Sequence, residues 1–164
     1  MSELSILEQL CFSTTRIETE DERGNNYSGT GFFFNLQIED KIIPIVVTNK
    51  HVVKGMVKGM FLITERDSAG NPIYKSHFPV KYETSFESMW IMHPAEDIDL
   101  CILPYNMIVE AAQRIFKKDL FFRALDNSLI PTLEQLNDLD VVEDVLMIGY
   151  PNGLWDATHN MPII

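Results

Sequence analysis

The feature that most constrains the fold is a succession of short apolar runs, rich in β-branched and aromatic residues and separated by turn residues. The runs "GTGFFFNLQI" and "KIIPIVVTNK" flank a short "EDK" turn, and "GMFLITERD" and "PIYKSHFPVKY" flank "SAGN". Each arrangement predicts a β-hairpin, because such runs form strands and small polar residues permit tight turns. "SMWIMHP" and "DIDLCILPY" predict two further short strands. This spacing favours an antiparallel barrel or sandwich over a parallel sheet.

The pattern changes after residue 105. The stretch "NMIVEAAQRIFKKDLFFRAL" predicts a helix, because its apolar residues recur at helical spacing: Ile108, Val109, Ala112, Ile115, Phe116 and Leu120. "TLEQLNDL" predicts a short helix, and "DVVEDVLMIGYPNG" predicts a return to strand that ends in a Pro-Asn-Gly turn. The sequence therefore predicts a mainly β protein with one or two bridging helices.

Composition excludes several classes of protein. The chain has 164 residues, enough for one ordinary domain or part of a larger one, and its net charge is −11 without a dense basic patch, which argues against nucleic-acid binding. No apolar run approaches the roughly 20 residues that span a bilayer, and the start "MSELSILEQL" lacks the cationic region of a secretory signal. Cys11 and Cys101 form no disulfide framework. We expect a cytoplasmic protein with no membrane partner.

Ionisable residues interrupt two of the apolar runs. In "IVVTNKHVVKG" the predicted strand ends on His51, and in "EDIDLCIL" Asp97 and Asp99 lie within an otherwise apolar strand. A histidine there could be a capping or hydrogen-bonded core residue. A buried carboxylate is costly unless it is paired, so a buried His and a buried Asp in one barrel can satisfy each other. This is also the pairing that acyl transfer needs, with an imidazole base oriented by a carboxylate.

Four motifs occur in order: "SGTGFFF", "VVTNKHVV", "DIDLCIL" and "MIGYPNG". Together they resemble the successive landmarks of trypsin-like (chymotrypsin-fold) serine peptidases of bacterial type, over about residues 28 to 155. The resemblance implies an antiparallel β-barrel of the trypsin-like type. It divides the chain into a lead-in segment (1–27), a first six-stranded barrel (28–105), a helical bridge (106–137) and the incomplete start of a second barrel (138–164). It also implies a polypeptide substrate.

The resemblance assigns His51 as the general base and an aspartate as the residue that orients it. Asp99 is favoured for the second role, because Cys101 is then the small residue that the family has two places after its aspartate. Asp97 is the alternative, although it would place the charged Asp99 at that small-residue position. Val52 stands where many animal secreted members have a cysteine, which fits a disulfide-free relative.

The family's nucleophile motif, Gly-[Asn/Asp]-Ser-Gly, does not occur in this sequence. No serine has a Gly-x-Ser-Gly context; the serines are Ser2, Ser5, Ser13, Ser28, Ser68, Ser76, Ser85, Ser88 and Ser128. Neither cysteine replaces the serine, because Cys11 precedes the barrel and Cys101 reads as a buried thiol within a strand. We therefore expect the chain to supply the base and the orienting acid without the nucleophile, as a fragment or truncated product that is inactive alone.

A catalytically inactive, peptidase-like binding or scaffolding module is the alternative function. The missing nucleophile favours it, and the retained His and Asp disfavour it. We expect self-association through the exposed edge of the incomplete second barrel. We expect neither a metal nor a cofactor, because His77, His93 and His159 are isolated in the sequence and "GTG" lacks the remaining features of a dinucleotide fingerprint.

Overall fold

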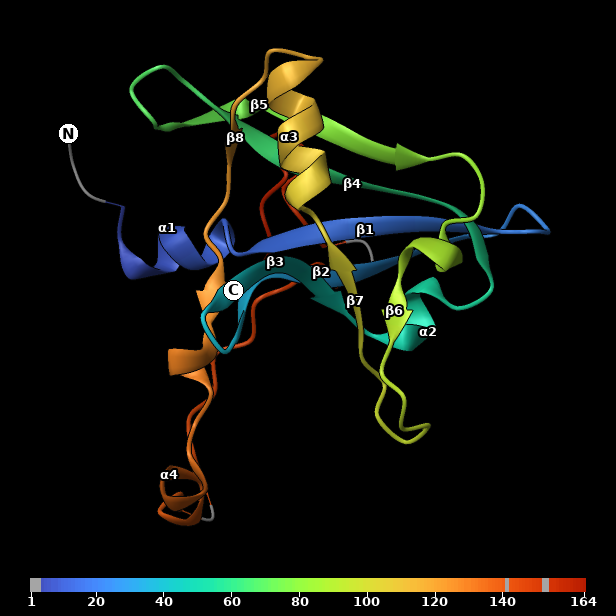
Figure 1. The fold of residues 1–164 in the computed structure, drawn as a ribbon. Helices are drawn as coiled ribbons and strands as arrows, with labels where there is room; N and C mark the ends of the chain where they lie inside the picture. The colour runs from blue at the N-terminus through green and yellow to red at the C-terminus, as the bar shows by residue number, and fades with distance from the viewer. Residues whose placement is uncertain (1–3, 141, 152–153) are drawn as a thin grey trace.

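The computed structural model describes residues 4–140, 142–151 and 154–164, and its central feature is one nine-stranded sheet (Figure 1). The strands are β1 (Thr14–Asp21), β2 (Asn26–Ile38), β3 (Lys41–Thr48), β4 (Met56–Arg66), β5 (Pro72–Tyr82), β6 (Ile91–Met92), β7 (Cys101–Pro104), β8 (Leu120–Phe121) and β9 (Leu125–Asp126). Their order is β5-β4-β1-β2-β3-β7-β6, with β8 beside β4 and β9 beside β2. The predicted mainly antiparallel β class is confirmed, and the strand path is open. Barrel closure stays a prediction.

Both predicted hairpins form as expected. Strands β2 and β3 pair antiparallel from Ile38 opposite Lys41, and β4 and β5 pair across the "SAGN" turn. The turn is closed by Asp67, whose carboxylate accepts from the main-chain N–H groups of Ala69 and Asn71. An aspartate that bonds the backbone two and four residues later stabilises such a turn, which explains why these two strands meet in this register.

Strand β1 lies in the part of the chain that the sequence assigned to the lead-in segment. It runs between β2 and β4, near the middle of the sheet. Its inward face is Thr15, Ile17 and Thr19, all at most 3% exposed, and the residues between them face outward. Because two of the three inward residues are threonines, the alternation does not stand out as an apolar pattern. For this reason the sequence did not predict this central strand.

The helices are α1 (Ile6–Cys11), α2 (Lys50–Val53), α3 (Asn106–Arg114) and α4 (Leu133–Asn137), with 3-10 turns η1 (Glu87–Met89) and η2 (Asn127–Leu129). The predicted short helix in "TLEQLNDL" is confirmed as α4, whose first turn is closed by a capping box between Thr132 and Gln135. Within the described ranges, no helix has the length and apolar character needed to cross a bilayer.

The helix predicted to run from residue 106 to residue 120 and beyond is wrong in its length. Lys117 has a left-handed backbone (φ 56°), and the N–H of Lys118 donates to the carbonyl of Ala112 at 2.9 Å. This is the pattern of a helix C-terminus, so the chain leaves the helical path after α3. Leu120 then enters β8 and pairs with Glu65 of β4. Leu120 and Phe121, both nearly buried, therefore pack as residues of a strand rather than of a helical face.

The strand predicted in "DVVEDVLMIGYPNG" is also not found among its described residues; Asn152 and Gly153 of the predicted turn lie outside them. The described residues of the segment 129–140 and 142–147, here called the apolar arm, project from the sheet with α4 near the tip (Figure 1). The apolar side chains of the arm are largely in solvent, with Leu133, Val142 and Val145 each more than 80% exposed. A strand needs a neighbour to pair with, and the described arm has none. An isolated antiparallel bridge joins Gly149 to Ile163.

Candidate functional site

The site begins where β3 ends and the chain turns into α2. The sequence predicted a strand that ends on His51, but β3 stops at Thr48 and His51 lies in the first turn of α2. Two valines fix the helix: Val52 and Val53 are 8% and 0% exposed and belong to the hydrophobic core. Because consecutive residues of a helix point in different directions, burial of this valine pair leaves the preceding His51 facing outward. The imidazole therefore lies at the surface, on a short helix that is anchored in the core.

Asp99 lies in the loop of residues 93–100, which joins β6 to β7. The strand begins at Cys101, so Asp99 precedes it rather than lying within it as predicted. None of the side chains in this loop is buried. The loop is closed at its base by the main-chain N–H of His93, which donates to the carbonyl of Leu100 at 2.9 Å. Its position places Asp99 directly against the start of α2.

His51 and Asp99 make two hydrogen bonds to each other. The ring Nδ1 of His51 lies 2.5 Å from Oδ2 of Asp99, and the main-chain N–H of His51 donates to Oδ1 at 3.0 Å. A carboxylate can only accept, so Nδ1 carries the proton in this pair. The hydrogen bond from the His51 ring is the main cause that lowers the pKa of Asp99 below its ordinary value. Asp99 therefore fixes both the orientation and the tautomer of the imidazole.

The geometry leaves Nε2 of His51 as the available acceptor. With the proton on Nδ1, a neutral imidazole presents an unprotonated Nε2, and no described residue hydrogen-bonds to it. A nitrogen of this kind can take a proton from a hydroxyl and later return it. The arrangement can therefore act as a general base and acid once a hydroxyl lies within reach.

The expected burial of the pair is wrong. The side chains of His51 and Asp99 are 71% and 48% exposed, because they come from a helix end and a surface loop rather than from the interior of two strands. Their contact therefore does not compensate for the burial of charged groups. Exposed ion pairs contribute little to stability, so the stability of the fold does not explain this one.

Asp97, the alternative acid, lies exposed in the same loop. Its side chain makes no hydrogen bond or ion pair with His51 or with any other described residue, whereas Asp99 makes both of the bonds to His51. A second His–Asp contact occurs elsewhere, between His159 Nδ1 and Asp156 Oδ2 at 2.7 Å. It lies within a single local turn, because Asp156 also accepts from the main-chain N–H groups of Thr158 and His159.

The remaining candidate side chains do not join the pair. Cys101 is buried in β7, and burial raises the pKa of its thiol to about 12, which leaves it protonated and unreactive at neutral pH. Cys11 is half-buried, and burial raises the pKa of its thiol as well. His77 contacts Thr64, and His93 accepts from the N–H of Ala95 within its own loop. The described chain holds no group of three His, Cys, Asp or Glu side chains that could bind a metal ion.

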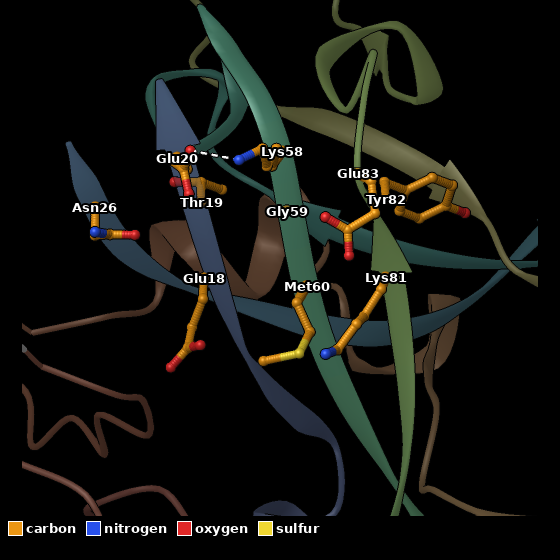
Figure 2. Close-up of a pocket in the computed structure, with 10 residues that line it drawn as sticks. All are labelled: Glu18, Thr19, Glu20, Asn26, Lys58, Gly59, Met60, Lys81, Tyr82 and Glu83. Carbon is orange, nitrogen blue, oxygen red and sulfur yellow. Dashed lines mark hydrogen bonds and ion pairs between the residues drawn. The ribbon is translucent and has the colours of Figure 1, made fainter. Parts of the chain in front are cut away.

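A shallow hollow of about 170 Å³ lies elsewhere, on the outer face of β1, β4 and β5 (Figure 2). Charged side chains of both signs line it: Glu18, Glu20, Lys58, Lys81 and Glu83. Glu20 and Lys58 pair at 2.7 Å, as the dashed line in Figure 2 shows. Neither His51 nor Asp99 lines this hollow, so it is separate from the candidate site.

The four sequence motifs have clear places in the fold. "SGTGFFF" lies in β2, and "VVTNKHVV" spans the end of β3 and all of α2. "DIDLCIL" spans the second half of the Asp99 loop and most of β7, and the described part of "MIGYPNG" includes the bridge at Gly149. Asn49 and Lys50 also donate to main-chain carbonyls of this loop, and sequence reasoning missed both contacts. Asn favours the position before a helix, so Asn49 could have indicated where α2 begins, but not that its side chain contacts the loop. No protein-family model matches the chain, and neither the curated proteins nor the solved structures contain a significant match.

Proposed function

We propose that this chain is the first barrel, with the start of the second, of a trypsin-like serine endopeptidase. In this proposal it supplies the general base His51 and the orienting acid Asp99. The observation that carries the proposal is the two-point contact between them, which fixes the ring and leaves Nε2 free to accept. A surface loop gains little stability from holding an imidazole this way, whereas general-base catalysis requires that the imidazole be held so.

In the proposed reaction, His51 Nε2 accepts the proton of a serine hydroxyl as its oxygen attacks a peptide carbonyl. The imidazolium that forms is stabilised by Asp99, and His51 then donates the proton to the leaving amine. The serine and the donors that stabilise the oxyanion lie outside this sequence, since no Gly-x-Ser-Gly occurs in it.

The barrel belongs to the same proposal. The strand path runs β5-β4-β1-β2-β3-β7-β6, and pairing between its two end strands, β5 and the two-residue β6, would close a barrel. The exposed side chains of the apolar arm support a second packed unit, because many large apolar side chains left in solvent along one segment point to a site of contact. We propose that the rest of the second barrel, to which residues 138–147 of the arm belong, packs there.

The test compares the natural protein with two pairs of variants. Labelling by a serine-directed fluorophosphonate reports a reactive serine, and cleavage of a mixed peptide library reports turnover. Asp99→Asn should lower kcat about 10⁴-fold and His51→Ala about 10⁶-fold. The matched control is the His159–Asp156 pair, which has a similar contact but lies in no motif. His159→Ala and Asp156→Asn should leave both readouts unchanged.

The peptidase proposal would be overturned by a natural product that contains this chain but no added serine segment, does not react with the fluorophosphonate and cleaves no peptide. It would favour the second candidate, a peptidase-like binding module. The observation in favour of that candidate is that no described hydroxyl or thiol hydrogen-bonds to His51. Equal loss of activity in the His51 and His159 variants would also contradict the proposal, because it would point to a general effect on folding.

A further inference from the structure

Three consecutive residues at the start of α2 bind the loop that carries Asp99. Besides His51, the side-chain amide of Asn49 donates to the main-chain carbonyl of Asp99 at 2.8 Å. The ammonium group of Lys50 donates to the main-chain carbonyl of Ala95 at 2.7 Å. One side chain thus holds the end of the loop next to β7, and the other reaches across to its first half.

The loop depends on such bonds because it lacks apolar anchors. All its side chains from His93 to Leu100 are exposed or half-exposed. Its internal hydrogen bonds, such as those made by the N–H groups of His93 and Ala95, shape the loop but do not tie it to α2. A segment with few buried contacts opens easily unless hydrogen bonds hold it. Its placement over α2 therefore depends on residues 49 to 51.

Asn49 occupies the N-cap position but does not cap its own helix. An N-cap Asn usually accepts a hydrogen bond from its own first turn, and here Asn49 makes no such bond. The carboxylate of Asp99 accepts from the N–H of His51 instead. Because Asp99 supplies the acceptor for this N–H, the side chain of Asn49 can turn its NH2 group towards the loop instead of its oxygen towards the first turn of α2. The bond from Asn49 to the carbonyl of Asp99 thus links the position of Asp99 to the identity of residue 49.

We propose that Asn49 and Lys50 are positioning residues that hold Asp99 in contact with His51. As a role in catalysis this rests on the proposed function, but the positioning itself is a property of this chain and can be measured without activity. Loss of either side-chain donor lets the loop move away from α2 and weakens the contact between Asp99 and His51.

The experiment follows the low-field ¹H NMR signal of the His51 Nδ1 proton and the ¹³C titration of the Asp99 carboxyl. Asn49→Ala and Lys50→Met should each speed exchange of that proton with water roughly two- to tenfold, the effect of one lost hydrogen bond. Each should also move the pKa of Asp99 up towards its ordinary value. Lys50→Arg keeps a donor and should restore both readouts. Lys54→Met is the matched control, because Lys54 is exposed at the other end of α2 and its side chain has no described partner.

Circular dichroism separates these effects from unfolding. Variants whose melting curves match that of the parent protein, but whose proton exchange and Asp99 titration are unchanged, would overturn the positioning role. So would Lys54→Met changing them as much as Lys50→Met does. If the two readouts respond as expected while the natural protein has no peptidase activity, the positioning role stands and the proposed function fails. If activity is present, both variants should lower kcat with little change in KM.

Discussion

Replacement of Gly29 by alanine should displace the helix that carries His51. Strand β2 passes so close to α2 here that a methyl carbon on Gly29 would lie 2.5 and 2.7 Å from the two methyl groups of Val52. It would also lie 3.2 Å from Val52 Cβ, so rotation of the valine side chain alone does not clear the contact. Carbon atoms prefer separations of about 3.5–4.0 Å. The backbone of α2 must therefore move away, and His51 moves with it.

The size of the effect follows from the two sides of this contact. Overpacking of this kind costs about 1–3 kcal/mol. Val52 is 8% exposed, and Val52→Ala removes two nearly buried carbons at ~0.8 kcal/mol each, about 1.6 kcal/mol in total. Independent changes would make the double variant roughly 2.6–4.6 kcal/mol less stable. Because the alanine methyl at position 29 fills space that Val52→Ala vacates, we expect the double variant to lose only ~1–2 kcal/mol.

Urea unfolding of the parent protein, both single variants and the double variant measures this coupling. Gly31→Ala is the matched control, because its methyl would meet Ile17 and Val46 at 2.9 and 3.0 Å, away from α2. It should destabilise the protein, and Val52→Ala should not rescue it. The coupling would be refuted if the losses of unfolding free energy of Gly29→Ala and Val52→Ala simply added in the double variant. It would also be refuted if Val52→Ala restored the stability of Gly31→Ala as much as that of Gly29→Ala. The Nδ1 proton signal of His51 should weaken in Gly29→Ala and recover in the double variant.

Three further predictions concern single groups. The hydrogen bond from His51 lowers the pKa of Asp99, so the pair stabilises the fold at pH values above the ordinary Asp pKa of about 3.9. This contribution is lost as the pH falls through the lowered pKa of Asp99. The difference in Tm between the parent protein and Asp99→Asn should therefore shrink below about pH 4. Tyr150→Phe should cost about 1 kcal/mol in urea unfolding, because the buried Tyr150 hydroxyl donates to the carbonyl of Asn160 at 3.2 Å. Iodoacetamide at pH 8 should label Cys11 well before Cys101, whose buried thiol has a pKa near 12, and both equally in denaturant.

The sequence predicted those strands whose side chains are apolar on the inward face. The β2–β3 and β4–β5 hairpins combine β-branched or aromatic runs with strong turn residues, and both form. Strand β1 escaped prediction because Thr15 and Thr19 share its inward face with Ile17. The apolar residues after α3 were assigned to a helix because spacing alone does not show that Lys117 turns the backbone left-handed.

The candidate site was predictable as a pair of residues but not as a geometry. The motif order picked out His51 and favoured Asp99, and the structure brings these two side chains together. Sequence reasoning placed both in buried strands, because an apolar run was taken to continue through the ionisable residue. In the fold each lies just outside its strand, in α2 or in the loop before β7. The hydrogen bonds of Asn49 and Lys50 depend on the path of that loop, which local patterns do not encode.

Exposure of the pair bears directly on the proposed chemistry. Water competes for the hydrogen bonds of His51 and Asp99 while 71% and 48% of their side chains remain in solvent. Polypeptide packed over them would lower the local dielectric constant, strengthen their contact and keep Nε2 for the reacting hydroxyl. The exposed apolar side chains of the arm, such as Leu133 and Val145, independently indicate a surface that packs against another polypeptide. In our proposal one second barrel covers both features. A natural partner or chain segment that protects the arm, but leaves the Nδ1 proton exchanging as fast as before, would contradict this reasoning.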